Sequence, residues 1–140
     1  MRAYEARIDI DAPPEAIWPA LADAGRWPDW DSGVRRVEGT VAPGAKVSLI
    51  TEASDRAFPV TVAELDPPRR MVFRGGTPLG LFRGVRTYTL TPGEAGRTAF
   101  AMREEYTGPL APLVFRSIPD LQPSFEHFAA GLKTRVEDGG

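Results

Sequence analysis

Arg86 and Glu104 are the residues of this sequence best placed to do chemistry inside a protein. Each is a charged residue on a strand face that is otherwise apolar or small: Phe82, Gly84, Tyr88 and Leu90 accompany Arg86, and Phe100, Met102 and Tyr106 accompany Glu104. A buried charge is costly unless it is paired, so we expect the two to form an ion pair. That pair can orient a polar group of a ligand, Glu104 can serve as an acid or a base, or the pair can lie at a cavity mouth and satisfy only itself.

The pairing depends on the hairpin that carries the two residues. Residues 82–91 and 97–107 alternate in polarity and flank residues 92–96, and a connection of about five residues is typical of a long antiparallel hairpin. If the hairpin closes symmetrically around Glu94 or Ala95, Arg86 and Glu104 lie opposite each other or one diagonal step apart. A bulge would change the register and separate them.

The other residue types that could act in catalysis or bind a metal give weaker candidates than Arg86 and Glu104. The chain has one histidine, His127, and no cysteine, so a multi-histidine or thiolate metal site is excluded and we expect no metal and no cofactor. A general base needs an orienting partner and reach to a substrate; the sequence shows neither for His127, which we expect at the surface or at a pocket rim. No serine lies in a Gly-x-Ser-x-Gly elbow. The glycine-rich residues 75–81 lack the Lys-Ser/Thr ending of a phosphate loop and predict a mobile connection or pocket lid.

Composition limits the class of protein. The 140 residues are expected to form a single domain, 1–140. The 17 basic and 19 acidic residues are interspersed, with a formal net charge of −2, which argues against a nucleic-acid partner. No apolar run approaches the ~18 residues of a membrane span, and the N-terminus shows no signal-peptide core. We therefore expect a cytoplasmic protein, a monomer or homodimer.

The elements that must position these residues begin with a strand and two short helices. Residues 4–10 alternate between apolar and charged side chains, which predicts a half-buried strand. A proline pair opens a short helix over residues 14–23, and Pro19 should bend or shorten it. Residues 26–30 form a second, tighter turn that carries Trp27 and Trp30. Both tryptophans lie near the expected pocket rim, and we expect at least one of them to pack in the core.

Short strands with turn signals between them fill the middle of the chain. The expected strands cover residues 34–40, 46–52, a segment around Phe58, Val60 and Val62, residues 70–74, and the two strands of the long hairpin. Proline and glycine pairs separate them. This order is typical of an antiparallel meander rather than of alternating strands and helices.

The last segment predicts a long helix. Five apolar residues recur at intervals of three or four, namely Leu121, Phe125, Phe128, Leu132 and Val136. That spacing indicates an amphipathic helix over residues 123–137. Residues 109–118 should form a helical or kinked lead-in. The class is therefore α+β: a curved antiparallel sheet of about seven strands wrapped around a long C-terminal helix, with two short helices after the first strand.

This arrangement implies a cavity. A strongly bent sheet cannot touch one straight helix along its whole length, and the gap is the origin of an apolar pocket. Helix residues Phe125, Phe128 and Leu132 would line its floor. The opposing wall would consist of Phe58, Val60, Val62, Phe73, Tyr88, Met102 and Tyr106, with Arg86 and Glu104 as polar groups and Trp27 near the rim.

The sequence also resembles a known family. The matching stretches are residues 8–18 (IDIDAPPEAIW), 21–23 (LAD), 27–30 (WPDW), 66–70 (DPPRR), 106–110 (YTGPL) and, more loosely, 131–137 (GLKTRVE). They are similar to the polyketide-cyclase/START-related (SRPBCC) ligand-binding superfamily, whose members share the birch-pollen-allergen-like helix-grip fold. The resemblance implies that fold over nearly the whole chain. It implies much less about function, because the superfamily includes lipid carriers, cyclases, hydrolase-like members and co-chaperone-related domains.

Three functions follow from the sequence and the resemblance. The first is binding or carrying a small hydrophobic molecule, such as a lipid, a polyketide-like or an aromatic compound, in the cavity. The second is a polyketide cyclase or dehydratase in which Arg86, Glu104 and Tyr88 or Tyr106 polarise a carbonyl and move a proton. The third is a co-chaperone-like interaction module, for which we expect a collapsed pocket and an exposed apolar patch.

Overall fold

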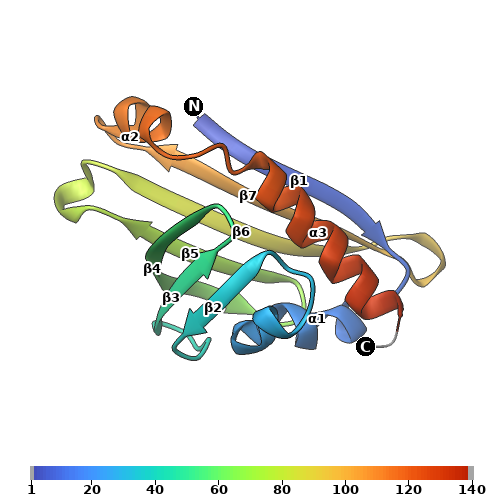
Figure 1. Cartoon of the computed structure of the whole chain (residues 1–140). Coiled ribbons are helices and arrows are strands. Elements are labelled where there is room, and N and C mark those ends of the chain that lie inside the picture. The colour runs from blue at the N-terminus through green and yellow to red at the C-terminus, as the bar shows by residue number, and fades with distance from the viewer. Residues whose placement is uncertain (1, 139–140) are drawn as a thin grey trace.

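The computed structural model describes residues 2–138 (Figure 1). Its seven-stranded antiparallel sheet has the order β1-β7-β6-β5-β4-β3-β2. The strands are β1 (Arg2–Ile10), β2 (Val34–Glu38), β3 (Lys46–Thr51), β4 (Ser54–Asp66), β5 (Arg70–Gly76), β6 (Arg83–Pro92) and β7 (Thr98–Thr107). The α+β class and the curved sheet around a C-terminal helix, both predicted from the sequence, are confirmed.

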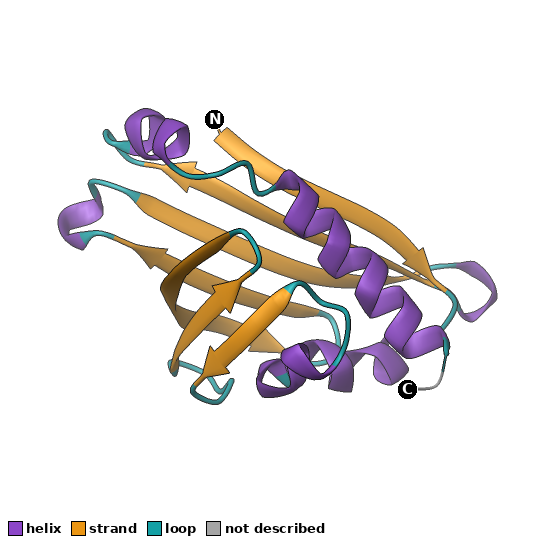
Figure 2. Cartoon of the chain, in the orientation of Figure 1, coloured by secondary structure: helices purple, strands orange, loops and turns teal. Residues whose placement is uncertain are grey.

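Helices close one end and one face of the sheet (Figure 2). The α-helices are α1 (Pro14–Ala22), α2 (Ala111–Ser117) and α3 (Gln122–Glu137), and the short 3₁₀ turns are η1 (Ala24–Asp29), η2 (Pro78–Gly80) and η3 (Glu94–Gly96). Pro14 and Pro123 both lie in the first turn of a helix, where a missing N–H costs little. Pro123 therefore begins α3 instead of interrupting it.

The sheet bends away from α3, and irregular pairing accounts for the bend. α3 packs along β1 and also touches β7, so it covers only one side of the sheet. Toward the other side, the register shifts between Val34 and Arg36 in β2, between Leu49 and Thr51 in β3, and between Val62 and Glu64 in β4. Bulges bend and twist the strand that holds them, so the β2–β4 part curls over the concave face (Figure 1).

The core is solid at the end of the sheet near α1. Trp27 is fully buried and its indole nitrogen donates to the carbonyls of Ala20 and Leu21, each at 3.2 Å. Its ring packs edge-on against Phe128, with the centroids 4.9 Å apart, and contacts Tyr88. This aromatic cluster fixes η1 under the sheet and forms the closed end of the interior.

α3 approaches the neighbouring loop most closely at Gly131. A Cβ atom at this position would lie 1.8 Å from the carbonyl oxygen of Asp31, far inside van der Waals contact. Only glycine allows this approach. The contact places the residues after η1 directly beside α3.

Candidate functional site

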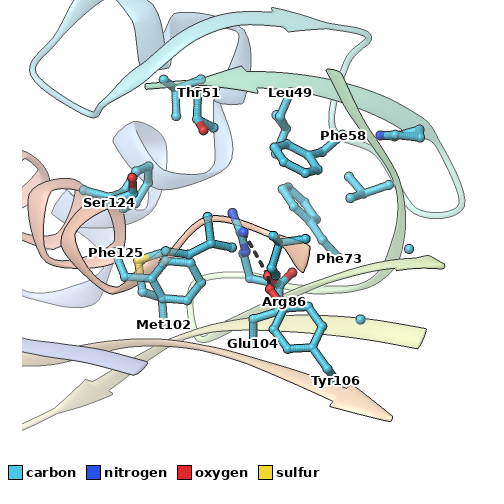
Figure 3. A pocket seen from close by; sticks show the side chains of 18 of the residues that line it. Leu49, Thr51, Phe58, Phe73, Arg86, Met102, Glu104, Tyr106, Ser124 and Phe125 are labelled. Atoms are coloured by element: carbon cyan, nitrogen blue, oxygen red, sulfur yellow. Dashed lines mark hydrogen bonds and ion pairs between the residues drawn. The ribbon is translucent and has the colours of Figure 1, made fainter. Parts of the chain in front are cut away.

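A cavity of about 350 Å³ lies between the concave face of the sheet and α3. Its wall is mostly apolar, and Figure 3 shows Leu49, Phe58 and Phe73 from the sheet facing Phe125 of α3. Polar atoms enter from few places, chiefly Arg86 and Glu104 on β6 and β7. A concave, apolar space with a small number of polar groups is the usual character of a small-molecule site.

The structure brings most of the predicted site residues together around this cavity. The lining includes Trp27, Phe58, Val60, Phe73, Arg86, Tyr88, Met102, Glu104, Tyr106, Phe125 and Phe128. Val62 and Leu132 are fully buried but lie in the solid core and do not line the cavity. Leu132 lies one turn beyond Phe128, toward the end of α3 that packs against α1.

Trp27 takes the core position that we expected for at least one of the two tryptophans of this turn, and not a place at the rim. Its exposed fraction is 0 %, and it lies at the deep end of the cavity. The reason is η1, which turns the indole inward under the sheet, where both helix carbonyls accept its N–H.

Several lining residues were not among the predicted site residues. They include Leu49, Thr51, Phe82, Val114, Ile118, Leu121 and Ser124. Phe82 carried a usable signal, because it alternates with Arg86 and Tyr88 on one face of the hairpin. Val114 and Ile118 carried none, since their place depends on how the segment from α2 to α3 folds back over the sheet.

The Arg86–Glu104 pair forms as the symmetric hairpin requires. The two residues are direct partners in the register of β6 and β7, and Arg86 Nη2 donates to Glu104 Oε2 at 3.2 Å (dashed line in Figure 3). The Tyr106 hydroxyl donates to the same carboxylate oxygen. The side chains of Arg86 and Glu104 are only 18 % and 14 % exposed. The two residues therefore form a buried charge pair inside an apolar cavity.

Burial and charge together determine the protonation states in the cavity. Burial opposes the charge on Arg86, but the Glu104 carboxylate and Tyr88 outweigh it, so the pKa of Arg86 lies above its usual value. Burial raises the pKa of Tyr88, and burial together with Glu104 raises the pKa of Tyr106. Both phenols therefore keep their protons at neutral pH and can donate hydrogen bonds.

The opposite end of the cavity lies beneath a group of exposed leucines. Thr77 and Phe82 flank η2 and line the cavity, as does Val114 of α2. The large apolar residues exposed in the described part of the chain gather in these same two segments: Leu79, Leu81, Leu110 and Leu113. The segments are joined, since the Leu110 amide donates to the Leu81 carbonyl at 2.9 Å. Gly75, Gly76 and Thr77 of the glycine-rich segment border the cavity, and the lid stays a prediction.

His127 belongs to a second charged cluster, at the side of the cavity. Its Nδ1 lies 2.6 Å from Glu52 Oε2 and its Nε2 lies 2.6 Å from Asp31 Oδ1. The hydrogen bond with Asp31 is the largest of the effects that raise the pKa of His127, and Glu52 adds to it. With a side chain 34 % exposed, His127 lies at the surface as predicted, but with two orienting partners.

No metal site emerges from these acidic groups. Within residues 2–138 there is no set of three or more His, Cys, Asp or Glu side chains arranged to hold a metal ion. Both nitrogens of His127 already face carboxylates. Over the same residues, no helix is long and apolar enough to cross a membrane.

Comparison with known families decides the relationship. A family model described as "Polyketide cyclase / dehydrase and lipid transport" matches residues 1–137. The chain belongs to this family. A search of curated protein sequences gave no significant match.

Several solved structures share the fold at low sequence identity. The START superfamily protein from Mycobacterium smegmatis is 16 % identical, with a TM-score of 0.72 and 99 % of each chain covered. The Zhui aromatase/cyclase from Streptomyces sp. R1128 is 17 % identical, with a TM-score of 0.69, covering 99 % of this chain and 98 % of that one. The di-domain aromatase/cyclase BexL of the BE-7585A biosynthetic pathway is 20 % identical, with a TM-score of 0.70; the match covers 98 % of this chain but only 47 % of BexL.

Proposed function

We propose that this protein binds and carries a small hydrophobic molecule in the cavity between the sheet and α3. The observation that supports this proposal best is the cavity itself, which stays open although aromatic side chains surround it. Its apolar lining favours removal of an apolar ligand from water at roughly 25 cal/mol per Å² of buried apolar surface. We propose Trp27, Phe58, Val60, Phe73, Tyr88, Met102, Phe125 and Phe128 as the apolar contacts of that ligand, with Arg86, Glu104 and Tyr106 as its polar contacts.

A cyclase or dehydratase is the second candidate, and the polar cluster in the cavity favours it. Arg86, Glu104, Tyr88 and Tyr106 are the groups that would polarise a carbonyl and move a proton. In this arrangement, however, Glu104 Oε2 already accepts hydrogen bonds from Arg86 and Tyr106. These two hydrogen bonds stabilise the charged carboxylate and make it a weaker base, so carriage is the primary proposal.

A co-chaperone-like module is less well supported. The exposed leucines of η2 and α2 agree with it, but the open cavity does not, since that function was expected to leave the pocket collapsed. We also propose that the protein works in the cytoplasm as a monomer or homodimer, with a small molecule and not a nucleic acid as its partner. Its interspersed charges give no basic surface for nucleic acid.

Native mass spectrometry of the purified protein tests the carriage proposal. We expect a co-purifying apolar molecule, or saturable one-to-one binding of the neutral fluorophore N-phenyl-1-naphthylamine by the emptied protein. Ser124→Phe places a ring in the cavity from α3 and should reduce the fluorophore's affinity by at least about tenfold, which is ~1.4 kcal/mol.

Ala130→Phe is the matched control, because residue 130 lies on the exposed side of the same helix. It should leave the affinity unchanged. Equal effects of Ser124→Phe and Ala130→Phe, or no bound molecule and no fluorophore binding at all, would contradict the proposal.

A further inference from the structure

A second hollow, of about 370 Å³, borders the cavity near η2 and is lined by cations. The charged residues of its lining are Lys46 of β3, Arg74 of β5 and Arg83 of β6, and no Asp or Glu belongs to that lining. All three cations are exposed. Thr61 and Thr77 add hydroxyl groups. We call this space the basic hollow.

The register of the sheet places the three cations together on one face. Thr61 of β4 is the direct partner of Lys46 on one side and of Arg74 on the other. Arg83 lies one diagonal step from Arg74 across β5 and β6, a distance of about 7–8 Å. Phe73, next to Arg74, is buried and faces the cavity. Since neighbours in a strand point to opposite faces, the cations lie on the outer face of the sheet.

These cations have no carboxylate of their own. The ion pairs formed within residues 2–138 do not include Lys46, Arg74 or Arg83. At the other end of β5, by contrast, Arg70 Nε lies 2.9 Å from Glu64 Oε2. A hollow lined by charges of one sign raises the local concentration of the opposite ion. The basic hollow should therefore attract an anion.

The basic hollow adjoins the cavity where β4 and β5 separate. Their pairing ends at Thr61 and Arg74. Beyond this point β4 pairs with β3 and β5 pairs with β6, because β4 arches over the concave face (Figure 1). Six residues at this separation line both spaces: Pro59, Val60, Gly75, Gly76, Thr77 and Phe82.

Glycines keep the boundary between the two spaces thin. β5 ends in Gly75 and Gly76, and both residues line the cavity and the basic hollow. A Cβ atom at Gly75 would lie 3.0 Å from the carbonyl oxygen of Pro59 and 3.7 Å from Val60 Cγ1, so a side chain here would fill the space between the strands. With glycine, backbone alone lies at this place, and one small molecule is long enough to reach both spaces.

The charge balance assigns an acidic group to the basic hollow and not to the cavity. Inside the cavity, Glu104 already neutralises Arg86, with Oε2 3.2 Å from Nη2. A ligand carboxylate there would be a second negative charge in mostly apolar surroundings, which is costly without a cation of its own. In the basic hollow an acid meets three unpaired cations and keeps part of its hydration.

We propose that the ligand is an amphipathic acid whose apolar body occupies the cavity and whose anionic oxygen group, such as a carboxylate, lies among Lys46, Arg74 and Arg83. This inference rests on the proposed carriage of a hydrophobic molecule and adds the chemical class of that molecule. An apolar cavity of about 150 Å³ accommodates the six carbons of benzene. The cavity of about 350 Å³ therefore has room for an apolar body of roughly ten carbons.

Three probes with one alkyl chain test the inference by displacement of N-phenyl-1-naphthylamine at pH 7.5 and low salt. They are decanoate, which carries the acid, 1-decanol, which is neutral, and decylammonium, which carries a positive charge. The wild-type protein should bind decanoate about tenfold more tightly than 1-decanol, and decylammonium more weakly than either. Added NaCl should reduce the preference for decanoate, because salt screens exposed charges.

Substitutions in the basic hollow locate the acid. Arg74→Gln and Arg83→Gln should each reduce the preference for decanoate over 1-decanol to about threefold. The triple variant, which adds Lys46→Gln to these two, should abolish the preference and leave the affinity for 1-decanol unchanged. Arg56→Gln is the matched control, because Arg56 is an exposed cation of β4 outside the lining of the basic hollow. It should retain the full preference.

A substitution in the cavity tests whether one molecule uses both spaces. Ser124→Phe places a ring in the cavity and should weaken decanoate and 1-decanol alike, since both chains lie there. A decanoate affinity that Ser124→Phe leaves unchanged would place the acid outside the cavity altogether and contradict the inference.

The remaining outcomes separate this inference from carriage itself. Equal affinity of the wild-type protein for decanoate and 1-decanol would contradict the acidic ligand and leave carriage standing. A preference that survives in the triple variant would overturn the assignment of the basic hollow. If the fluorophore binds but none of the three probes displaces it, the amphipathic chain is wrong and carriage still stands, whereas absence of fluorophore binding contradicts carriage.

Discussion

Arg86 and His127 are both held by carboxylates, but they differ in burial and in what surrounds them. His127 faces Glu52 and Asp31, one at each ring nitrogen and each at 2.6 Å. Arg86 is held by Glu104 through Nη2, with the Tyr88 hydroxyl beside its guanidinium and the Phe125 ring 4.8 Å from its guanidinium carbon. The first cluster is partly exposed beside the cavity, and the second is buried within it.

This difference shows how a structural cluster is told from a binding cluster. Both clusters raise the pKa of their cation, so a shifted pKa does not distinguish them. Partners from separate elements at the surface indicate a tie between those elements, here between α3, the loop after η1 and the β3–β4 turn. A charged pair in the wall of an apolar cavity indicates a place for a polar group of a ligand.

The largest loss of stability is expected when the buried Arg86–Glu104 pair loses its carboxylate. Glu104→Ala leaves Arg86 charged and unpaired in the cavity wall, and should lower the free energy of unfolding by about 3 kcal/mol. Replacing both partners, as in Arg86→Met with Glu104→Leu, should restore most of this loss because no buried charge remains. Urea unfolding measures both. A Glu104→Ala loss below ~1 kcal/mol would mean that water reaches Arg86 freely.

The outer cluster is best disturbed without changing any charge. Gly131→Ala puts a methyl group against the Asp31 carbonyl and must push the loop away from α3. Overpacking costs about 1–3 kcal/mol, partly offset by about 1 kcal/mol of helix propensity, so a net loss of up to about 2 kcal/mol is expected in thermal or urea unfolding.

The control for this substitution is Thr134→Ala, at an exposed position of the same helix. It should stabilise the protein by a few tenths of a kcal/mol, since alanine is the better helix former. NMR titration of Gly131→Ala should also show the pKa of His127 falling toward its usual value as Asp31 moves away. An unchanged pKa would mean that the loop position does not maintain the cluster.

The smallest effect is the pH dependence contributed by His127. Its pKa in the folded protein is raised above the usual value of 6.5, so the folded state binds the proton more tightly than the unfolded state. The stabilisation is complete below about pH 6.5 and is lost as pH rises through the raised folded pKa. For this partly exposed group we expect about 0.5–1 kcal/mol.

Between pH 6 and pH 9, the free energy of unfolding of the wild-type protein should fall as the pH rises. His127→Gln should remove this slope, and chemical unfolding over the same pH range will measure it. The double variant Arg86→Met with Glu104→Leu should keep the wild-type slope, because it removes the buried pair without leaving a lone carboxyl group that titrates in this range. A wild-type stability that rises with pH over the same range, or a slope retained in His127→Gln, would contradict the assigned role of His127.

The sequence pattern was sufficient to predict those parts of the structure whose geometry depends on residues close together in the chain. The hairpin of β6 and β7 is the clearest case, because alternation and a short connection together imply the register that pairs Arg86 with Glu104. The α3 stripe is another, since Phe125 and Phe128 face the cavity as their spacing predicts.

Non-local geometry accounts for what the sequence did not reveal. Alternation puts Val62 on the inner face but does not say where along the sheet the cavity ends, and this residue lies in the solid core. Asp31 and Glu52 are 96 and 75 residues from His127, so its partners depend on the bend of the sheet and on the close approach at Gly131.

Xenon binding measured in crystals under gas pressure is the most direct test of the account, because it detects open apolar space without assuming any ligand chemistry. We predict xenon density between α3 and the concave face of the sheet, in contact with side chains such as Leu49, Phe73 and Phe125. An interior with no xenon, or with those side chains packed against one another, would contradict the carriage proposal.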